Sequence, residues 1–213
     1  MFITKNAELI NIDSDFEKAV QQAKKIYLEG SVFIYPTDTI YGFGANPFNS
    51  DAVKRIDEIK HRESGKMYIL LINSIEVLLK YIEIKSEKHL DFLLNIWPNP
   101  ISVVLTLNSK TSNILGTETA AFRIPNHRFC VKLTSELQMP LISTSVNRSS
   151  NPPMLDPTVI ADEFSSEINA IFYSDKKCYY EASTIIDLSD TAPILLREGK
   201  IKFEDILEKF QKS

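Results

Sequence analysis

The sequence predicts an α/β (α+β) fold in which one twisted sheet of parallel and antiparallel strands is flanked by helices. Segments with apolar residues at helical spacing alternate along the chain with short, β-branched or wholly apolar runs of strand length. The two kinds of segment interleave without the strict strand–helix–strand rhythm of an all-parallel sheet. The chain has 213 residues, of which 44% are hydrophobic, so it can bury one good core.

The first helix is expected to begin at Ser14, because Glu17 stands three residues further on and completes a capping box. Apolar residues then recur at helical spacing as far as Tyr27, and Gly30 ends the segment. Further helices are expected at 50–59, 75–79, 89–96, 129–137 and 203–210.

The clearest strand pattern is at 101–107, where the sequence I-S-V-V-L-T-L is β-branched and alternating. The continuous apolar run 67–72 has the length of a buried strand. Further short strands are expected at 32–34, 120–124, 141–144, 170–173, 184–188 and 194–197. No repeat, linker or low-complexity tract divides the chain, so residues 1–213 are expected to form a single domain.

Charge and cysteine content limit the classes of partner. The formal net charge is −4, which disfavours broad nucleic-acid binding unless basic side chains are clustered. Cys130 and Cys178 lie far apart without CxxC spacing, so we expect two buried thiols in a reducing cytosol. The N-terminal segment lacks a signal-peptide pattern, and no apolar run approaches the roughly 18 residues of a membrane span. A cytoplasmic protein without membrane association is expected.

Several common catalytic motifs are absent from the sequence. It contains no G-x-x-x-x-G-K-[ST] phosphate loop, no G-x-G-x-x-G dinucleotide turn and no G-x-S-x-G nucleophile motif. The three histidines, His61, His89 and His127, show no metal-ligand spacing with each other or with the cysteines. We therefore expect no resident metal site.

The segment 35–44, Y-P-T-D-T-I-Y-G-F-G, is the most informative run of polar residues. It follows an apolar stretch and precedes a helical pattern, so it is expected to be a loop after a strand. A turn needs only the proline and the glycines. Two threonine hydroxyls, a carboxylate and a phenol go beyond that need, so we expect the loop to hold a small polar ligand.

Five further polar clusters stand at the expected ends of strands or helices. They are 60–66, 117–128, 143–153, 183–184 and 197–199. Lysine and arginine at 60–66 could complement a helix dipole or grip phosphate oxygens. The Ser/Asn-rich segment 143–153 could be a turn or part of a binding site. Arg123 falls in an apolar strand pattern and needs a partner, either a structural carboxylate or a ligand carboxylate.

Together these clusters supply several hydroxyls and at least four cations to an otherwise acidic chain. A pocket for an anionic, polyphosphate-bearing ligand would show this pattern. The motifs, in chain order, are P-T-D-T-I-Y-G-F at 36–43, K-H-R at 60–62, P-N-P-I-S at 98–102, F-R-I-P at 122–125, T-S-V-N-R-S-S at 144–150, S-T-I-I-D at 183–187 and R-E-G at 197–199.

In this order and over almost the whole chain, the motifs resemble those of the YrdC family, the threonylcarbamoyl-adenylate synthases. Ser150 stands where the family pattern has a glycine. The resemblance implies a twisted mixed sheet with a concave basic cavity, in the short form without an extra C-terminal domain. It also implies that L-threonine, bicarbonate and ATP give threonylcarbamoyl-AMP and pyrophosphate. A partner transferase complex would then pass the threonylcarbamoyl group to the adenosine at position 37 of tRNA.

The resemblance also implies roles for individual residues. L-threonine would be held by Thr39, Arg123, Ser143 and Ser183, with Arg123 on the carboxylate. ATP would be held by Lys60, Arg62, Lys66, Thr119, Ser145 and Arg197, with Lys60 and Arg62 aligning charge and no distinct catalytic nucleophile. Mg²⁺ would travel with the triphosphate. Asn147 could position its loop or touch ligand. The alternative is a YrdC-like paralogue that binds RNA or nucleotide without synthase activity.

Overall fold

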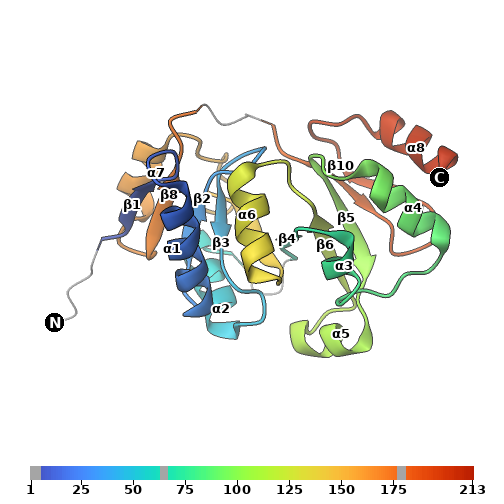
Figure 1. Cartoon of the computed structure of the whole chain (residues 1–213), viewed down its shortest axis with the longest axis horizontal. Helices are drawn as coiled ribbons and strands as arrows, with labels where there is room; N and C mark the ends of the chain where they lie inside the picture. The colour runs from blue at the N-terminus through green and yellow to red at the C-terminus, as the bar shows by residue number, and fades with distance from the viewer. Residues whose placement is uncertain (1–5, 63–66, 177–180) are drawn as a thin grey trace.

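The computed structural model describes residues 6–62, 67–176 and 181–213. In these ranges ten strands form one sheet, in the order β1-β8-β2-β3-β7-β4-β6-β5-β9-β10. The strands are β1 (Glu8–Asn11), β2 (Phe33–Tyr35), β3 (Gly42–Gly44), β4 (Ile69–Leu71), β5 (Ile101–Thr106), β6 (Thr119–Arg123), β7 (Leu141–Ser145), β8 (Ala170–Tyr173), β9 (Thr184–Asp187) and β10 (Ile194–Arg197). The sheet runs along the long axis of the molecule, with β1 towards the N-terminal end and β10 towards the C-terminal end (Figure 1).

The sheet is mixed, as the sequence predicts. Parallel pairs are β1–β8, β2–β8, β4–β6 and β5–β9. Antiparallel pairs are β2–β3, β3–β7, β4–β7, β5–β6 and β9–β10. The strands β7, β4 and β6 are neighbours near the middle of the sheet, so residues far apart in the sequence meet there.

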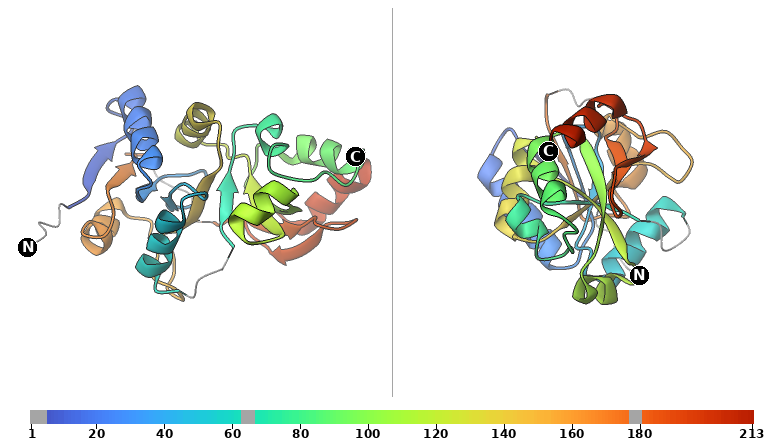
Figure 2. Two further views of the ribbon diagram at one scale, coloured as in Figure 1. Left: turned by 90° about the horizontal axis from the view of Figure 1, so that it is seen from below. Right: turned by 90° about the vertical axis from the view of Figure 1, so that its right-hand side faces the viewer.

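Helices lie on both sides of the sheet (Figure 2). They are α1 (Phe16–Leu28), α2 (Ser50–Lys60), α3 (Ile75–Leu78), α4 (Glu87–Ile96), α5 (Ser109–Leu115), α6 (Arg128–Leu137), α7 (Pro157–Phe164) and α8 (Phe203–Lys212). Alternation along β2 divides the core in two. Phe33 and Tyr35 pack with α1 and α6, whereas Ile34 packs with Ile56 of α2 and Phe164 of α7.

Helix α1 begins one residue later than the capping-box pattern predicts. Its N-cap is Asp15, whose carboxylate accepts a hydrogen bond from the Lys18 amide at 3.2 Å. Ser14 is therefore outside the helix, and the predicted cap was wrong. Aspartate is as good an N-cap as serine, so the two neighbouring positions could not be separated by residue type.

Four elements were not predicted: β1, β3, α5 and α7. Strand β3 lies inside the segment expected to be a loop, because two of its three residues are glycines and local propensity argues against a strand. It forms because it lies between β2 and β7 and pairs with both. Helix α7 carried a readable signal, since the carboxylate of Asp156 caps it and Pro157 is its first residue. No helix of the described part has the length and apolar character needed to cross a bilayer.

Gly44 in β3 packs directly against two aromatic rings, and its replacement by alanine should destabilise the fold. An added Cβ would lie 2.7 Å from Tyr35 Cε1 and 2.8 Å from two ring atoms of Phe33. Both rings are fully buried. We expect Gly44→Ala to lower the free energy of unfolding by about 1–3 kcal/mol, as measured by chemical denaturation.

Gly116 provides the control, because a Cβ there meets no atom within 4 Å although its φ is +68°. Gly116→Ala should therefore lower the free energy of unfolding by only about 1 kcal/mol, the cost of its backbone conformation. If the two substitutions cost the same, the packing explanation for Gly44 is wrong.

Candidate functional site

A cavity of about 170 Å³ brings together six of the ten residues predicted to bind substrates. These are Thr39, Arg123, Ser143, Ser145, Ser183 and Arg197. Ile69 and Ile185 supply apolar walls, and Tyr41 and Tyr68 also line the space. The residues come from the loop before β3, from β6 and β7, from the segment that leads into β9, and from β10.

The register of the central strands explains why these side chains meet. In the β4–β7 pair, Ile69 is opposite Ser143, and in the β4–β6 pair Leu71 is opposite Arg123. Alternate residues of a strand share one face, so Ser143 and Ser145 are on the same side of β7. The hydroxyls of Ser143 and Ser145 on β7 and the guanidinium of Arg123 on β6 therefore lie on either side of the short strand β4.

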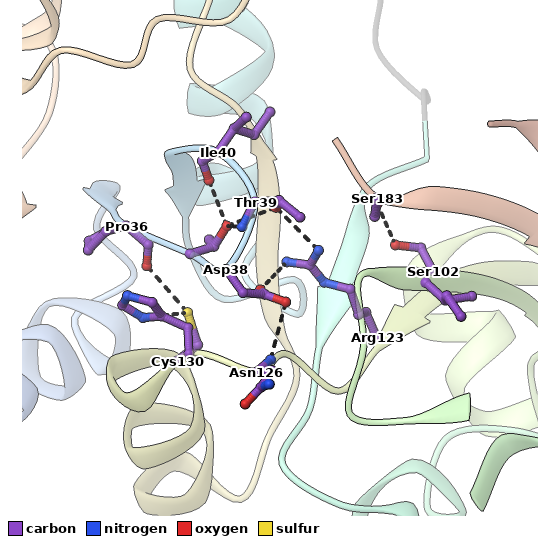
Figure 3. Close-up of polar contacts among 12 residues, drawn as sticks. Pro36, Asp38, Thr39, Ile40, Ser102, Arg123, Asn126, Cys130 and Ser183 are labelled. Atoms are coloured by element: carbon purple, nitrogen blue, oxygen red, sulfur yellow. Dashed lines mark hydrogen bonds and ion pairs between the residues drawn. The ribbon is translucent and has the colours of Figure 1, made fainter. Parts of the chain in front are cut away.

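Arg123 is almost fully buried and is held by the loop before β3 (Figure 3). Its Nη2 pairs with Asp38 Oδ1 at 3.1 Å, and its Nη1 donates to Thr39 Oγ1 at 3.2 Å. The other Asp38 oxygen accepts a hydrogen bond from the Asn126 amide at 3.2 Å. The first alternative for the partner of Arg123, a structural carboxylate, is thus confirmed.

One donor of the Arg123 guanidinium has no acceptor in the described part of the protein. Its Nε is buried and has no hydrogen-bond partner among the residues that the structure describes. A buried N–H without an acceptor is costly, and an anionic ligand group would satisfy it. A ligand carboxylate at Arg123 stays a prediction.

Arg197 and Ser183 form the opposite side of the cavity. Arg197 Nη2 donates to the Ser183 carbonyl at 2.8 Å. The Ser183 hydroxyl lies 3.0 Å from that of Ser102, which is fully buried on β5 (Figure 3). Gly199 supports this side, because an added Cβ would lie 2.3 Å from the Ala182 carbonyl oxygen. The glycine of the R-E-G motif is therefore required by the close approach of two backbone segments.

The electrostatics of the cavity favour an anion. Arg197 is exposed as a whole residue and also lines the cavity, where its guanidinium contacts Ser183. Partial desolvation of that group lowers the pKa of Arg197, and the positive charge of Arg123 lowers it further. Two cations that raise each other's free energy across one cavity would both be stabilised by a bound anion.

Lys60 does not line the cavity. Its amine is buried and donates to the Ser145 carbonyl at 2.5 Å, to the Asn147 carbonyl at 3.1 Å and to Asn147 Oδ1 at 2.7 Å. Burial, and then the charge of Arg62, lower the pKa of Lys60 to about 8. Lys60 thus stabilises the end of β7 and the loop that follows it, without lining the cavity. Its role in ATP binding stays a prediction.

Asn147 acts in the same loop. Its side-chain oxygen accepts from the Ser145 hydroxyl at 2.7 Å, and its amide donates to the Asn151 carbonyl at 2.5 Å. Of the two alternatives for Asn147, loop positioning is confirmed. Ser150 ends the motif with φ +69°, in the left-handed region that glycine favours, which accounts for the glycine of the family pattern.

Among the described residues, Arg62 is not part of the cavity lining, but it contacts Tyr68, which is. Its Nε donates to Asp57 Oδ1 at 2.8 Å, and its guanidinium lies 3.9 Å from the centre of the Tyr68 ring. Thr119 also lies outside the cavity, on the same face of β6 as Arg123 but four residues away, roughly 13 Å along the strand. Roles of Arg62 and Thr119 towards ATP stay predictions.

Some predicted features fall outside the described residues. Lys66, in the 60–66 cluster, and Cys178 are among them. Cys130 is buried at the start of α6, as expected. In the described ranges, no group of three or more His, Cys, Asp or Glu side chains could hold a metal ion.

Thr37, Asp38 and Ser102 contact residues of the cavity and were not predicted individually. Thr37 and Asp38 stand in the polar loop that the sequence singled out, and the need of Arg123 for a carboxylate could have pointed to Asp38. Ser102 interrupts an apolar strand, and a polar residue in such a strand is a usable signal. It is fully buried and contacts Ser183.

Comparison with known proteins gives the chain's family. The model of the Sua5/YciO/YrdC family, described as "Telomere recombination", matches residues 25–199. A threonylcarbamoyl-AMP synthase of Pyrococcus abyssi is 32% identical over 204 residues, which are 93% of this chain and 59% of the relative. One of Bacillus subtilis is 31% identical over 190 residues, 88% of this chain and 55% of the relative. The chain thus spans less than two thirds of the length of these curated relatives.

Solved structures agree with this assignment. The structure of P. abyssi Sua5 complexed with L-threonine has a TM-score of 0.86 at 30% identity, and the match covers 94% of this chain and 60% of that one. E. coli YciO has a TM-score of 0.84 at 24% identity, covering 95% of this chain and all of that one, and this likeness shows the shared fold. The predicted fold and the resemblance read from the motifs are both confirmed: the chain belongs to the Sua5/YciO/YrdC family.

Proposed function

We propose that this protein is an enzyme, a nucleotidyltransferase that forms threonylcarbamoyl-AMP and pyrophosphate from L-threonine, bicarbonate and ATP. The observation that carries the proposal is the cavity, in which two arginines and several hydroxyls face one another. The family relationship supports it, since the relatives are named threonylcarbamoyl-AMP synthases and Sua5 of P. abyssi has been solved with L-threonine.

The proposed chemistry needs no protein nucleophile. The amine of threonine adds to bicarbonate and gives a carbamate with loss of water. A carbamate oxygen then attacks the α-phosphorus of ATP, the bond from that phosphorus to the bridging oxygen breaks, and pyrophosphate leaves. Both reacting groups are anions, so the protein has to align them and neutralise their charge.

The residues of the cavity fit these tasks. Arg123 would bind the threonine carboxylate with its guanidinium, and Thr39, Ser143 and Ser183 would surround the rest of the amino acid. Arg197 would bind phosphate oxygens, and Lys60, Arg62, Lys66, Thr119 and Ser145 would complete the proposed ATP site; the Ser145 hydroxyl would first have to release Asn147 Oδ1. Mg²⁺ would be carried by the triphosphate and would neutralise part of its charge. The product would pass to a transferase complex that acts on tRNA.

Pyrophosphate release tests the proposal. The folded protein with Mg²⁺, ATP, bicarbonate and L-threonine should release pyrophosphate continuously, and omission of either threonine or bicarbonate should reduce release to background. Release that does not depend on threonine, or no release from a folded sample, would contradict the synthase. Tight, salt-sensitive tRNA binding without turnover would instead favour the paralogue that binds RNA or nucleotide only.

A further inference from the structure

The hydroxyl of Thr37 is fully engaged, although Thr37 does not line the cavity. Its Oγ1 donates to the Ile40 carbonyl at 2.7 Å, and a carbonyl can only accept. The same oxygen accepts from the Thr39 amide at 3.0 Å, and an amide N–H can only donate. Thr37 is 2% exposed, so water does not compete for these bonds. One proton and one lone pair of Thr37 are thus assigned, and one lone pair is left.

The remaining lone pair determines the direction of the Thr39 hydroxyl. The two hydroxyl oxygens lie 2.9 Å apart, and either could be the donor by geometry alone. Because Thr37 has already given its proton to Ile40, Thr39 has to be the donor in this contact. Thr39 Oγ1 also accepts from Arg123 Nη1 at 3.2 Å. Its proton and one lone pair are therefore used, and one lone pair is free.

We infer that Thr37 is a positioning residue, which turns the Thr39 hydroxyl so that Thr39 presents only a lone pair to the cavity. The ligand group beside Thr39 must then be a donor, an N–H or an O–H. The lone pairs of an acceptor, such as a carboxylate or phosphate oxygen, would be repelled by the lone pair of Thr39 Oγ1. Arg123 lines the same cavity and its guanidinium can only donate, so the two residues select opposite kinds of ligand group.

The identity of the ligand in this inference rests on the proposed function. If L-threonine is the ligand, its carboxylate belongs at Arg123, and its amine or its hydroxyl belongs at Thr39. The two arms of the following experiment distinguish the amine from the hydroxyl.

The test compares ligand pairs in which a donor is exchanged for an acceptor. L-threonine against O-methyl-L-threonine exchanges the hydroxyl donor, and L-2-aminobutyrate against 2-oxobutyrate exchanges the amine donor. Dissociation constants are measured by calorimetry for the unsubstituted protein, Thr37→Val and Thr37→Ser. In Thr37→Val the Thr39 proton is released and can turn to an acceptor. For each pair, the affinity ratio is the affinity of the donor ligand divided by that of the acceptor ligand. For the pair whose exchanged group binds at Thr39, we expect this ratio to fall by about fivefold or more in Thr37→Val and to be unchanged in Thr37→Ser.

The other ligand pair is the internal control, and its affinity ratio should be the same in all three proteins. Ratios that agree within twofold for both pairs would overturn the inference. So would a serine variant that behaves like the valine variant, because serine keeps the hydroxyl. A general loosening of the site would change both ratios and would also overturn it.

A second measurement needs no substitution, in case Thr37→Val does not fold. In the unsubstituted protein, the hydroxyl proton of Thr39 should exchange slowly at low temperature and show a nuclear Overhauser effect to Thr37. A proton that instead contacts Arg123 or points into the cavity would overturn the inference. Since this observation needs no ligand, it separates a wrong hydroxyl direction from a wrong substrate, which would appear as absent threonine binding.

Discussion

Replacing Arg123 with alanine should abolish high-affinity binding of L-threonine, with a loss of about 100-fold or more, and leave ATP binding largely intact. The guanidinium would lose charge-assisted hydrogen bonds to the threonine carboxylate, which contribute about 1.5–3 kcal/mol each. The same substitution should also lower the free energy of unfolding by about 3–5 kcal/mol, because it leaves the buried carboxylate of Asp38 without its cation. Calorimetry with each ligand and chemical denaturation measure the two effects.

The double variant Arg123→Ala/Asp38→Ala separates the two consequences. Removing both partners of the ion pair leaves no buried charge uncompensated, so part of the lost stability should return. Threonine binding should not return, because the group that binds the carboxylate is still missing. Recovery of threonine binding in the double variant would show that Arg123 acts only through the fold.

Replacing Arg197 with glutamine should weaken ATP binding by about tenfold or more and affect L-threonine less. Glutamine keeps a donor for the Ser183 carbonyl, so the cavity wall should be preserved while the charge is removed. Lys202→Gln is the matched control, because that lysine is exposed and pairs with Glu198 on the surface. It should leave both affinities unchanged.

Two different outcomes would contradict the assignment of Arg197 to ATP binding. Equal weakening of ATP and threonine by Arg197→Gln would place Arg197 at a site common to both substrates. An effect as large from Lys202→Gln would show that the net charge of the protein, and not the cavity, determines ATP affinity.

Much of the fold was predictable because buried positions of a helix or strand carry apolar residues, and the spacing of these residues is visible in the sequence. The pattern at 129–137 is that of α6, whose Phe129 and Leu133 are fully buried. Strand β3 was not predictable in this way. Its two glycines have no side chain to show a pattern, and the strand depends on pairing with β7, about a hundred residues later.

The site shows a similar division. The hydroxyls and arginines that line the cavity were recognisable from their place at strand ends and from the family motifs. The direction in which a long side chain points was not. Lys60 turns back to the Ser145 carbonyl at the end of β7 and to two oxygens of Asn147, which only the folded sheet brings close. Arg62 turns to Asp57, five residues earlier in the chain. Thr37 was missed for the same reason, since its influence on Thr39 depends on the position of the Ile40 carbonyl.

Identification of the reaction product shows whether this cavity joins threonine, bicarbonate and ATP. The protein is incubated with ATP, Mg²⁺, L-threonine and ¹³C-bicarbonate, and the mixture is analysed at once by mass spectrometry. We expect threonylcarbamoyl-AMP that carries one ¹³C atom, and we expect this product to be absent when threonine is omitted and strongly reduced in Arg123→Ala. AMP and pyrophosphate without a labelled adenylate, or ATP that stays intact with a folded protein, would contradict the proposed function.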